Sequence, residues 1–187
     1  MGDVTRMEHV GGDPVVDFVN TLGGLPAHPD DEYLHAYADL TAFAADAGLL
    51  TAVHARKLRR LAVAHPEPAA AALAAAKALR ARLDAILRAR LAGARPTAAD
   101  LEALREANVA ALAQARLTPE GWAWPARAAG PEDLPAPLWP LAQAATDLLR
   151  HGAPDRLARC ERCRRLFLDL SRDRSRRWCS RRGCGGS

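Results

Sequence analysis

All four cysteines of this chain lie between residues 160 and 184, in the spacing Cys-x2-Cys-x15-Cys-x4-Cys. Cysteine thiolates at such spacing are typical ligands of Zn²⁺, which binds four sulfurs in tetrahedral geometry. A site with four protein ligands leaves no position for water or substrate, so its metal is structural rather than catalytic. The spacing therefore predicts one structural Zn²⁺ bound by Cys160, Cys163, Cys179 and Cys184.

Three other states of these thiols are compatible with the spacing: two disulfides, a redox-active Cys160–Cys163 pair, or four unpaired thiols. Disulfides form in oxidising compartments. Residues 1–12 lack the apolar segment of a secretory signal, and no apolar run is long enough to span a bilayer. We therefore expect a cytoplasmic protein with reduced thiols and no membrane partner. A redox pair would leave two cysteines unexplained, and a segment with so little core needs metal to fold.

Arginines surround these cysteines. Residues 155–187 contain eleven arginines and four acidic residues, whereas residues 1–154 contain fifteen basic and eighteen acidic residues. A mildly acidic body with a basic segment is typical of proteins that bind nucleic acid. Guanidinium groups bind phosphate in a bidentate manner, and an aromatic ring can stack on a base. The candidate DNA contacts are Arg172, Arg174, Arg176, Arg177, Arg181 and Arg182, which flank Trp178.

The same residues also have a structural interpretation. The arginines can offset the excess negative charge of a four-thiolate site or remain solvated. We expect Trp178 to pack beneath the metal site, as part of the small core of the cysteine segment. We expect Asp169 to accept hydrogen bonds from arginine or backbone N–H groups rather than to bind the metal. The sequence leaves both interpretations of the arginines open.

A second group of polar residues, Asp17, Asn20 and Thr21, lies in or just after an apolar run. Residues 15–19 read Val-Val-Asp-Phe-Val between glycine and proline turn signals, which predicts a short strand. Polar groups in a buried strand need partners. Either the three side chains face a pocket that binds a small-molecule effector, or Asn20 and Thr21 merely satisfy backbone groups in the turn at Gly23.

Helical spacing of apolar residues dominates the rest of the chain. We expect helices over residues 31–47, 51–65, 69–92 and 97–112, a hairpin near 113–124, a Pro-rich connector over 125–140 and a last helix from Leu138. The alternation of Trp122 and Trp124 predicts that both rings face the core. The fold class is therefore α+β: a helix-rich N-terminal domain over 1–150, with a short N-terminal strand and the hairpin, and a four-cysteine zinc module over 155–187.

Catalysis has no support in the sequence. The six histidines are scattered, and none has the spacing of a metal or catalytic site. A nucleophile elbow and a phosphate-binding loop are also absent from the sequence. We therefore do not expect an enzyme.

The segment around the cysteines resembles the CGNR zinc-finger family. The matching elements are Cys160-Glu-Arg-Cys163, Phe167-Leu-Asp169-Leu-Ser171 and Arg176-Arg177-Trp178-Cys179. The N-terminal run Asp17-Phe-Val-Asn20-Thr21-Leu22 resembles the opening of the ABATE domain that is usually fused to this finger. That family is regarded as a group of stress-related bacterial transcription regulators. The resemblance therefore implies a DNA-binding regulator whose N-terminal domain senses an unknown small-molecule effector.

The end of the family motif differs here. The family has Cys-Gly-Asn-Arg followed by a basic helix, whereas this sequence reads Cys184-Gly185-Gly186-Ser187. All four expected ligands are kept, so the zinc prediction stands, but we expect weaker DNA contact than in relatives with the basic tail. Two alternative functions remain: a zinc-stabilised protein-interaction module without DNA binding, and an enzyme using a pocket in the N-terminal domain. The sequence indicates no oligomeric state.

Overall fold

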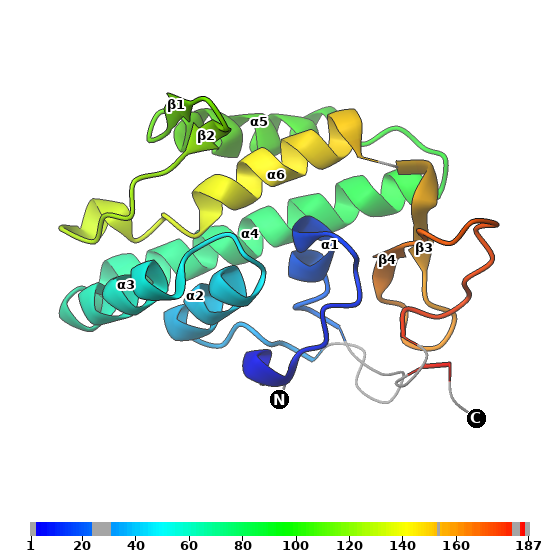
Figure 1. Ribbon diagram of the computed structural model, residues 1–187, viewed down its shortest axis with the longest axis horizontal. Coiled ribbons are helices and arrows are strands. Elements are labelled where there is room, and N and C mark those ends of the chain that lie inside the picture. Colours follow the sequence, from blue (N-terminus) through cyan, green and yellow to red (C-terminus); the bar gives the residue numbers. More distant parts are fainter. Residues whose placement is uncertain (1–2, 24–30, 153, 181–183, 186–187) are drawn as a thin grey trace.

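The computed structural model describes residues 3–23, 31–152, 154–180 and 184–185. The described chain is mostly helical, with two small antiparallel hairpins (Figure 1). Its elements are η1 (Val4–Arg6), α1 (Pro14–Val19), α2 (Tyr37–Asp46), α3 (Ala52–Ala64), α4 (Pro66–Leu91), α5 (Ala98–Leu112), β1 (Arg116–Thr118), β2 (Gly121–Ala123), η2 (Pro131–Asp133), α6 (Leu138–His151), η3 (Pro154–Arg156), β3 (Leu157–Arg159) and β4 (Leu166–Leu168). The helix-rich α+β fold is thus confirmed.

Helix α4 is the longest element and lies along the middle of the molecule (Figure 1). Pro66 stands at its start, where a proline needs no hydrogen-bond partner for its missing N–H. Its buried stripe repeats at helical spacing and contains Ala69, Ala72, Ala76, Leu79, Leu83, Ile86 and Leu87. The stripe packs against α1, α2, α3 and α5. None of the described helices is both long enough and apolar enough to cross a membrane.

The boundaries of several elements follow from local capping. The side chain of Thr51 accepts a hydrogen bond from His54 N at the start of α3, and Thr97 accepts one from Asp100 N at the start of α5. Such caps satisfy N–H groups that have no partner inside the helix. The predicted hairpin is confirmed, with Leu117 opposite Trp122 in β1 and β2.

The strand predicted for residues 15–19 is wrong, because Pro14–Val19 forms α1. Asp13 caps this helix by accepting a hydrogen bond from Val15 N (2.8 Å), and Pro14 occupies the first turn. A short apolar run does not distinguish a buried strand from a buried helix, and here the residues from Val15 to Val19 are all buried. Helix α1 packs against α4, α6 and β4, so it needs no polar face.

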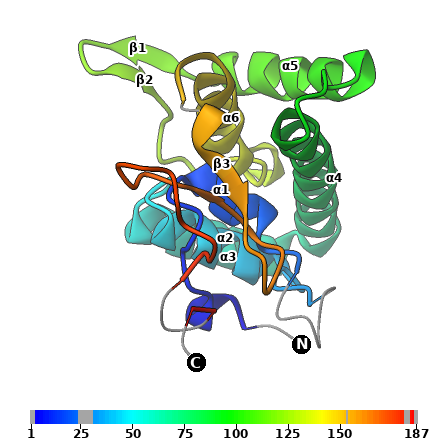
Figure 2. The same cartoon turned by 90° about the vertical axis from the view of Figure 1, so that its right-hand side faces the viewer.

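The prediction that Trp122 and Trp124 both face the core is also wrong. Trp122 is 46% exposed, whereas Trp124 packs against the core and donates from Nε1 to the carbonyl of Ala111 (2.8 Å). Strand β2 ends at Ala123, so the alternation of a strand does not extend to Trp124. The β1–β2 hairpin lies beside α5, far from the β3–β4 hairpin (Figures 1 and 2).

Strand β4 joins two clusters of buried side chains. Leu166 and Leu168 lie in the core that also contains residues of α1, α4 and α6. Phe167 points to the other side, where it packs with the four cysteines. Because successive side chains of a strand alternate between its faces, this single strand separates the helical core from the cysteine cluster.

Candidate metal centre and basic surface

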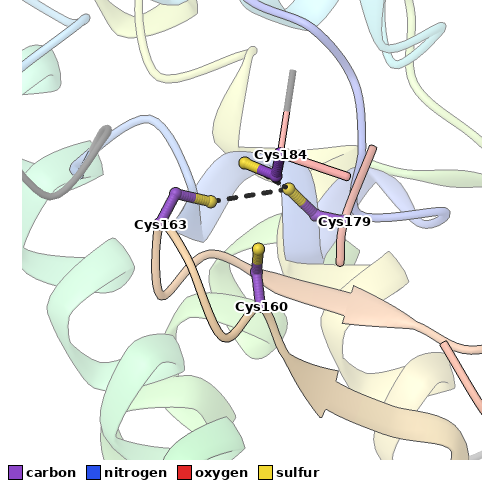
Figure 3. A group of neighbouring side chains, drawn as sticks. All are labelled: Cys160, Cys163, Cys179 and Cys184. Carbon is purple, nitrogen blue, oxygen red and sulfur yellow. Dashed lines mark hydrogen bonds between the residues drawn. The ribbon is translucent and has the colours of Figure 1, made fainter. Parts of the chain in front are cut away.

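The four cysteine side chains converge on one point (Figure 3). Cys160 follows β3, Cys163 lies in the turn before β4, and Cys179 and Cys184 come from the segment that returns after β4. The four sulfurs lie within 4.8 Å of one another, and every cysteine is at least nine-tenths buried. The four cysteines that are spaced along the sequence thus form one buried group of four sulfur donors.

The sulfur separations fit a tetrahedral zinc site. A Zn–S distance of about 2.3 Å gives tetrahedral edges of about 3.8 Å. The Cys163 and Cys179 sulfurs are 3.5 Å apart, and those of Cys179 and Cys184 are 3.8 Å apart. A disulfide requires about 2.05 Å, and all four cysteines are free thiols. The donor set is therefore consistent with one structural Zn²⁺ and not with the disulfide alternative.

Backbone hydrogen bonds form the turn that carries the first two cysteines. The N–H of Cys160 donates to the carbonyl of Arg165 (2.9 Å), and the N–H of Arg164 donates to the carbonyl of Cys160 (3.0 Å). The N–H of Glu161 donates to the carbonyl of Arg177 (3.1 Å), which ties this turn to the segment before Cys179. The turn therefore has a fixed position relative to the other two cysteines.

The Cys163, Cys179 and Cys184 thiols differ in acidity. The hydrogen bond with Cys179 lowers the pKa of the Cys163 thiol to about 5, and the same bond raises the pKa of Cys179. Burial raises the pKa of the Cys184 thiol to about 11. Cys163 therefore loses its proton readily, whereas Cys179 and Cys184 lose theirs when a cation binds in place of the protons. Zinc binding at this cluster is coupled to proton release.

Asp169 accepts hydrogen bonds, as predicted. Its carboxylate accepts from the backbone N–H of Ser171 (2.9 Å) and of Arg176 (2.8 Å). Burial alone raises the pKa of this carboxyl, but the hydrogen bonds from Ser171 and Arg176 bring it below its usual value. Asp169 thereby fixes the loop after β4 without taking part in the cysteine cluster.

Two of the candidate DNA-binding arginines have internal partners. Arg176 donates from Nη2 to the carbonyl of Cys179 (2.8 Å), and its guanidinium lies 4.8 Å from the centre of the Phe167 ring. Arg177 forms an ion pair with Glu161, with Nε donating to Oε2 at 2.9 Å. Both side chains therefore hold the cysteine segment in shape.

Arg172 and Arg174 are exposed, and their side chains have no hydrogen bond or ion pair with other residues that the structure describes. Arg181 and Arg182 lie outside the described residues. The prediction that Trp178 is a core residue is wrong, because its side chain is 39% exposed and lies beside the Arg177 guanidinium, 5.4 Å away. The exposed face of the segment thus combines free cations with an accessible aromatic ring.

Comparison with protein families agrees with this geometry. Residues 12–152 match the ABATE family, described as "Putative stress-induced transcription regulator", and residues 156–187 match the CGNR zinc finger. This chain belongs to the ABATE family and carries a CGNR zinc finger. Among curated proteins, none matches it. Below, the ABATE domain denotes residues 12–152 and the CGNR finger denotes residues 156–187.

In the ABATE domain, Asp17, Asn20 and Thr21 are buried and bonded internally. Asp17 accepts a hydrogen bond from the N–H of Gly11 (2.7 Å), and burial raises the pKa of its carboxyl. Thr21 donates from Oγ1 to the carbonyl of Phe18 (2.6 Å) and accepts from Arg80 (2.9 Å). These bonds satisfy the polar groups of Asp17 and Thr21 within the protein.

Asn20 joins the ABATE domain to the CGNR finger. Its Nδ2 donates to the carbonyl of Leu166 (2.8 Å), and its Oδ1 accepts from the N–H of Leu166 (2.9 Å). Next to it, the N–H of Leu168 donates to the carbonyl of Gly11 (2.8 Å). Gly11 is required here, since a Cβ at this position would lie 2.8 Å from the backbone nitrogen of Asp17. Residues near the start of the chain therefore complete the edge of β4.

Sequence reasoning missed the other contacts between the two parts. Arg165 donates from Nη2 to the hydroxyl of Tyr33 (3.0 Å), and its guanidinium lies 5.8 Å from the centre of that ring. Within the finger, sequence reasoning also missed the role of Arg156, which donates to the carbonyls of Asp169 and Ser171. The segment contains many arginines, so the sequence does not indicate which residues Arg165 and Arg156 contact.

A cavity of about 280 Å³ opens at this junction. Residues of the N-terminal segment and of the CGNR finger line it together, namely Arg6, Met7, Glu8, Asp31, Tyr33, Cys163, Arg165, Cys179, Ser180 and Cys184. Three of the four cysteines border this space, so an occupant would touch both the ABATE side and the metal centre.

Proposed function

We propose that this chain is a DNA-binding transcription regulator that acts in the cytoplasm, where bacterial DNA is accessible. The CGNR finger contacts the DNA, and the ABATE domain controls the position of the finger. One observation carries this proposal: the buried four-cysteine cluster organises a segment whose exposed residues include unpaired arginines and Trp178. Such a face attracts phosphate through charge and offers a ring for stacking.

The charge distribution supports this assignment. The finger carries an excess of positive charge, whereas the rest of the chain is mildly acidic. A basic patch confined to one face orients a protein on a polyanion, because the opposite face is repelled. Arg172 and Arg174 contribute to the contact directly. Arg176 and Arg177 contribute by maintaining the conformation of the finger, since their side chains already have partners.

We also propose that the ABATE domain senses a small-molecule effector. The cavity beside Tyr33 and Cys163 is a better place for an effector than Asp17, Asn20 and Thr21, whose polar groups are already satisfied. Its position at the junction means that an occupant would change the contacts between the two parts. Binding there would therefore bias the finger toward or away from DNA.

The test is a titration of duplex DNA with the full-length, zinc-loaded protein over a range of salt concentrations. Neutralising roughly three to five phosphates gives a log–log slope of affinity against salt of about −3 to −5. The control is the same protein after a chelator has removed the zinc. Without zinc the finger should lose its conformation, so this protein should bind duplex DNA more weakly. Absence of duplex binding by the zinc-loaded chain at low salt would contradict the proposal.

A protein-interaction module is the second candidate function, and one observation favours it. Leu117 and Trp122 form a cross-strand pair on the β1–β2 hairpin, and they are 72% and 46% exposed. Contiguous exposed apolar surface is a feature of protein contact sites, and this pair contributes such surface. The hairpin lies far from the CGNR finger, so a protein partner could bind there with or without DNA. The enzyme alternative gains no similar support, because the polar side chains it requires bond internally.

A further inference from the structure

Two residues of the CGNR finger have an unusual backbone conformation. Among the described residues, Arg164 and Arg174 are the non-glycine residues with positive φ, at 62° and 54°. The five other described residues with positive φ are glycines. In this left-handed region the Cβ of an ordinary residue crowds the backbone, so glycine is favoured there and asparagine is tolerated. The finger thus has an arginine at the two places where its backbone favours glycine.

Among the residues that the structure describes, the side chains of Arg164 and Arg174 make no contact that would offset this strain. Both residues are exposed. Neither side chain has a hydrogen bond, ion pair or ring contact with another described residue. Nearby carboxylates are already bonded, since Glu161 pairs with Arg177 and Asp173 accepts a hydrogen bond from Ser175 (2.8 Å). Strained residues cluster at functional sites, so an exposed and strained residue without a side-chain partner is a candidate for an interaction outside the protein.

The two positions belong to one rigid framework. Arg164 ends the turn of Cys160 and Cys163, where its N–H bonds to the carbonyl of Cys160. Arg174 lies in the loop between β4 and Cys179. The ion pair of Glu161 with Arg177, together with the backbone bond between the same residues, joins turn and loop. Both segments lie at the end of the molecule that carries β3 and β4, away from α2 and α3 (Figure 1).

We propose that Arg164 and Arg174 are two phosphate contacts of the DNA backbone, presented to solvent by left-handed turns of the zinc-held framework. This inference rests on the proposed DNA binding and assigns its anchoring residues. Exposed neighbours Arg162 and Arg172 add positive charge beside each contact. Guanidinium groups bind the paired oxygens of a phosphate in a bidentate manner, and fixed positions lower the entropy lost on binding. A phosphodiester backbone, which repeats this anion, fits two fixed cations better than an isolated carboxylate does.

The test compares variants of the full-length, zinc-loaded protein. In the R164G/R174G variant the backbone strain and the side chains are both removed. We expect an unchanged or higher unfolding temperature, one zinc per chain, and weaker duplex binding with a salt slope shallower by about 2. The R164A/R174A variant keeps the strain, so it should lose binding equally and have the lower unfolding temperature of the two. The R164K/R174K variant keeps the charges and should keep most of the slope.

The control is R60A/R95A, which removes two exposed arginines of the ABATE domain and matches the change in net charge. It should leave the slope unchanged. If R164G/R174G binds duplex DNA with the same salt slope as the parent chain, this inference is wrong, and the proposed function is unaffected. A lower unfolding temperature or loss of zinc in R164G/R174G also overturns it, because the arginines would then be structural. Absence of duplex binding by the parent chain refutes the proposed function itself. Polyglutamate serves as a probe for acidic protein partners. If the parent chain binds polyglutamate as tightly as duplex DNA, and R164G/R174G loses both equally, the arginines bind acidic proteins and the DNA assignment is wrong.

Discussion

Arg80 and Glu32 form a bidentate ion pair inside the ABATE domain. The guanidinium of Arg80, which is 5% exposed, donates to both carboxylate oxygens of Glu32 at 2.8 and 2.7 Å and to the hydroxyl of Thr21 at 2.9 Å. A buried guanidinium without such partners would be strongly destabilising. The pair therefore fixes the segment around Glu32 to α4, next to the residues that contact the finger.

This pair predicts a loss of stability in acid. Burial by itself raises the pKa of Glu32, but hydrogen bonds from Arg80 and from the N–H of Leu34 lower it from 4.5 to about 2. A lowered native pKa means that the unfolded state binds the proton more readily. The contribution is therefore complete above the unfolded pKa of about 4.5 and is lost as the pH falls toward 2.

The variant E32Q should be less stable than the parent chain at pH 7 and should lose less further stability between pH 4.5 and 2. Urea unfolding of both proteins in metal-free form measures this, since zinc loss then does not contribute. Equal losses of stability on acidification in the two proteins would show that other carboxylates dominate.

Arg176 and Arg172 provide a second comparison of single residues. Arg176 bonds to the carbonyl of Cys179 and covers Phe167, whereas Arg172 has no partner among the described residues. The variant R176A should release zinc to a chelator roughly tenfold faster, because a charged hydrogen bond beside a ligand is lost. The matched variant R172A should release zinc at the rate of the parent chain. Equal release from both variants would mean that Arg176 does not stabilise the cysteine segment.

The cysteines and the arginines show what sequence can predict at this scale. Four cysteines at ligand spacing are a strong signal, because thiols have few other roles in such a pattern, and Cys160, Cys163, Cys179 and Cys184 do cluster in the structure. Arginine has many roles, so the same segment does not indicate that Arg176 has an internal partner while Arg174 faces solvent. A large ring usually packs inside, so the sequence likewise does not indicate that Trp178 is partly exposed.

Among the elements, α1 is the one that sequence reasoning assigned to the wrong type. Its β-branched run favours a strand, but Asp13 and Pro14 start a helix, and packing against α4, α6 and β4 buries Val15 to Val19. Tertiary contacts therefore outweighed the local preference. The longer elements were predictable, because α3, α4 and α5 are long enough to show a helical period and have recognisable ends.

The contact of α1 with β4 predicts that Asn20 stabilises the whole chain. The variant N20A leaves the N–H and carbonyl of Leu166 without partners in a buried site, which should lower the free energy of unfolding by about 3 kcal/mol. Asn108 of α5 offers a matched control, since its Oδ1 has no hydrogen-bond partner. N108A should change the stability little. Urea unfolding compares the two, and a similar small effect for both would argue against the assigned role of Asn20.

At the scale of the whole molecule, the ABATE domain and the CGNR finger share a hydrophobic core. Leu157, Leu166 and Leu168 of the finger belong to the cluster that contains the helices. The division into units at 1–150 and 155–187 remains a prediction, and family boundaries alone do not show that each unit folds separately. The sequence could not reveal the shared core, because contacts between residues far apart leave no local pattern.

The shared core predicts how zinc removal affects the helices. Chelation should lower the unfolding temperature measured by the helical circular dichroism signal, and helices and finger should unfold in one transition, because metal binding to the native state alone stabilises everything coupled to it. Two independent units would instead show an unchanged helical transition after chelation. A variant with Cys160 and Cys163 replaced by serine should reproduce the effect of the chelator.

The bond between Asn20 and Leu166 joins positions that are 146 residues apart. Synthesis at about 5 to 20 residues per second separates the appearance of α1 at the ribosome from that of β4 by roughly 7 to 30 seconds. During this interval the side of α1 that faces β4 is accessible to chaperones and proteases. We expect newly made chains to mature only when the last hairpin docks and acquires its metal, so zinc supply would set how much protein accumulates in the cell as well as how well it binds DNA.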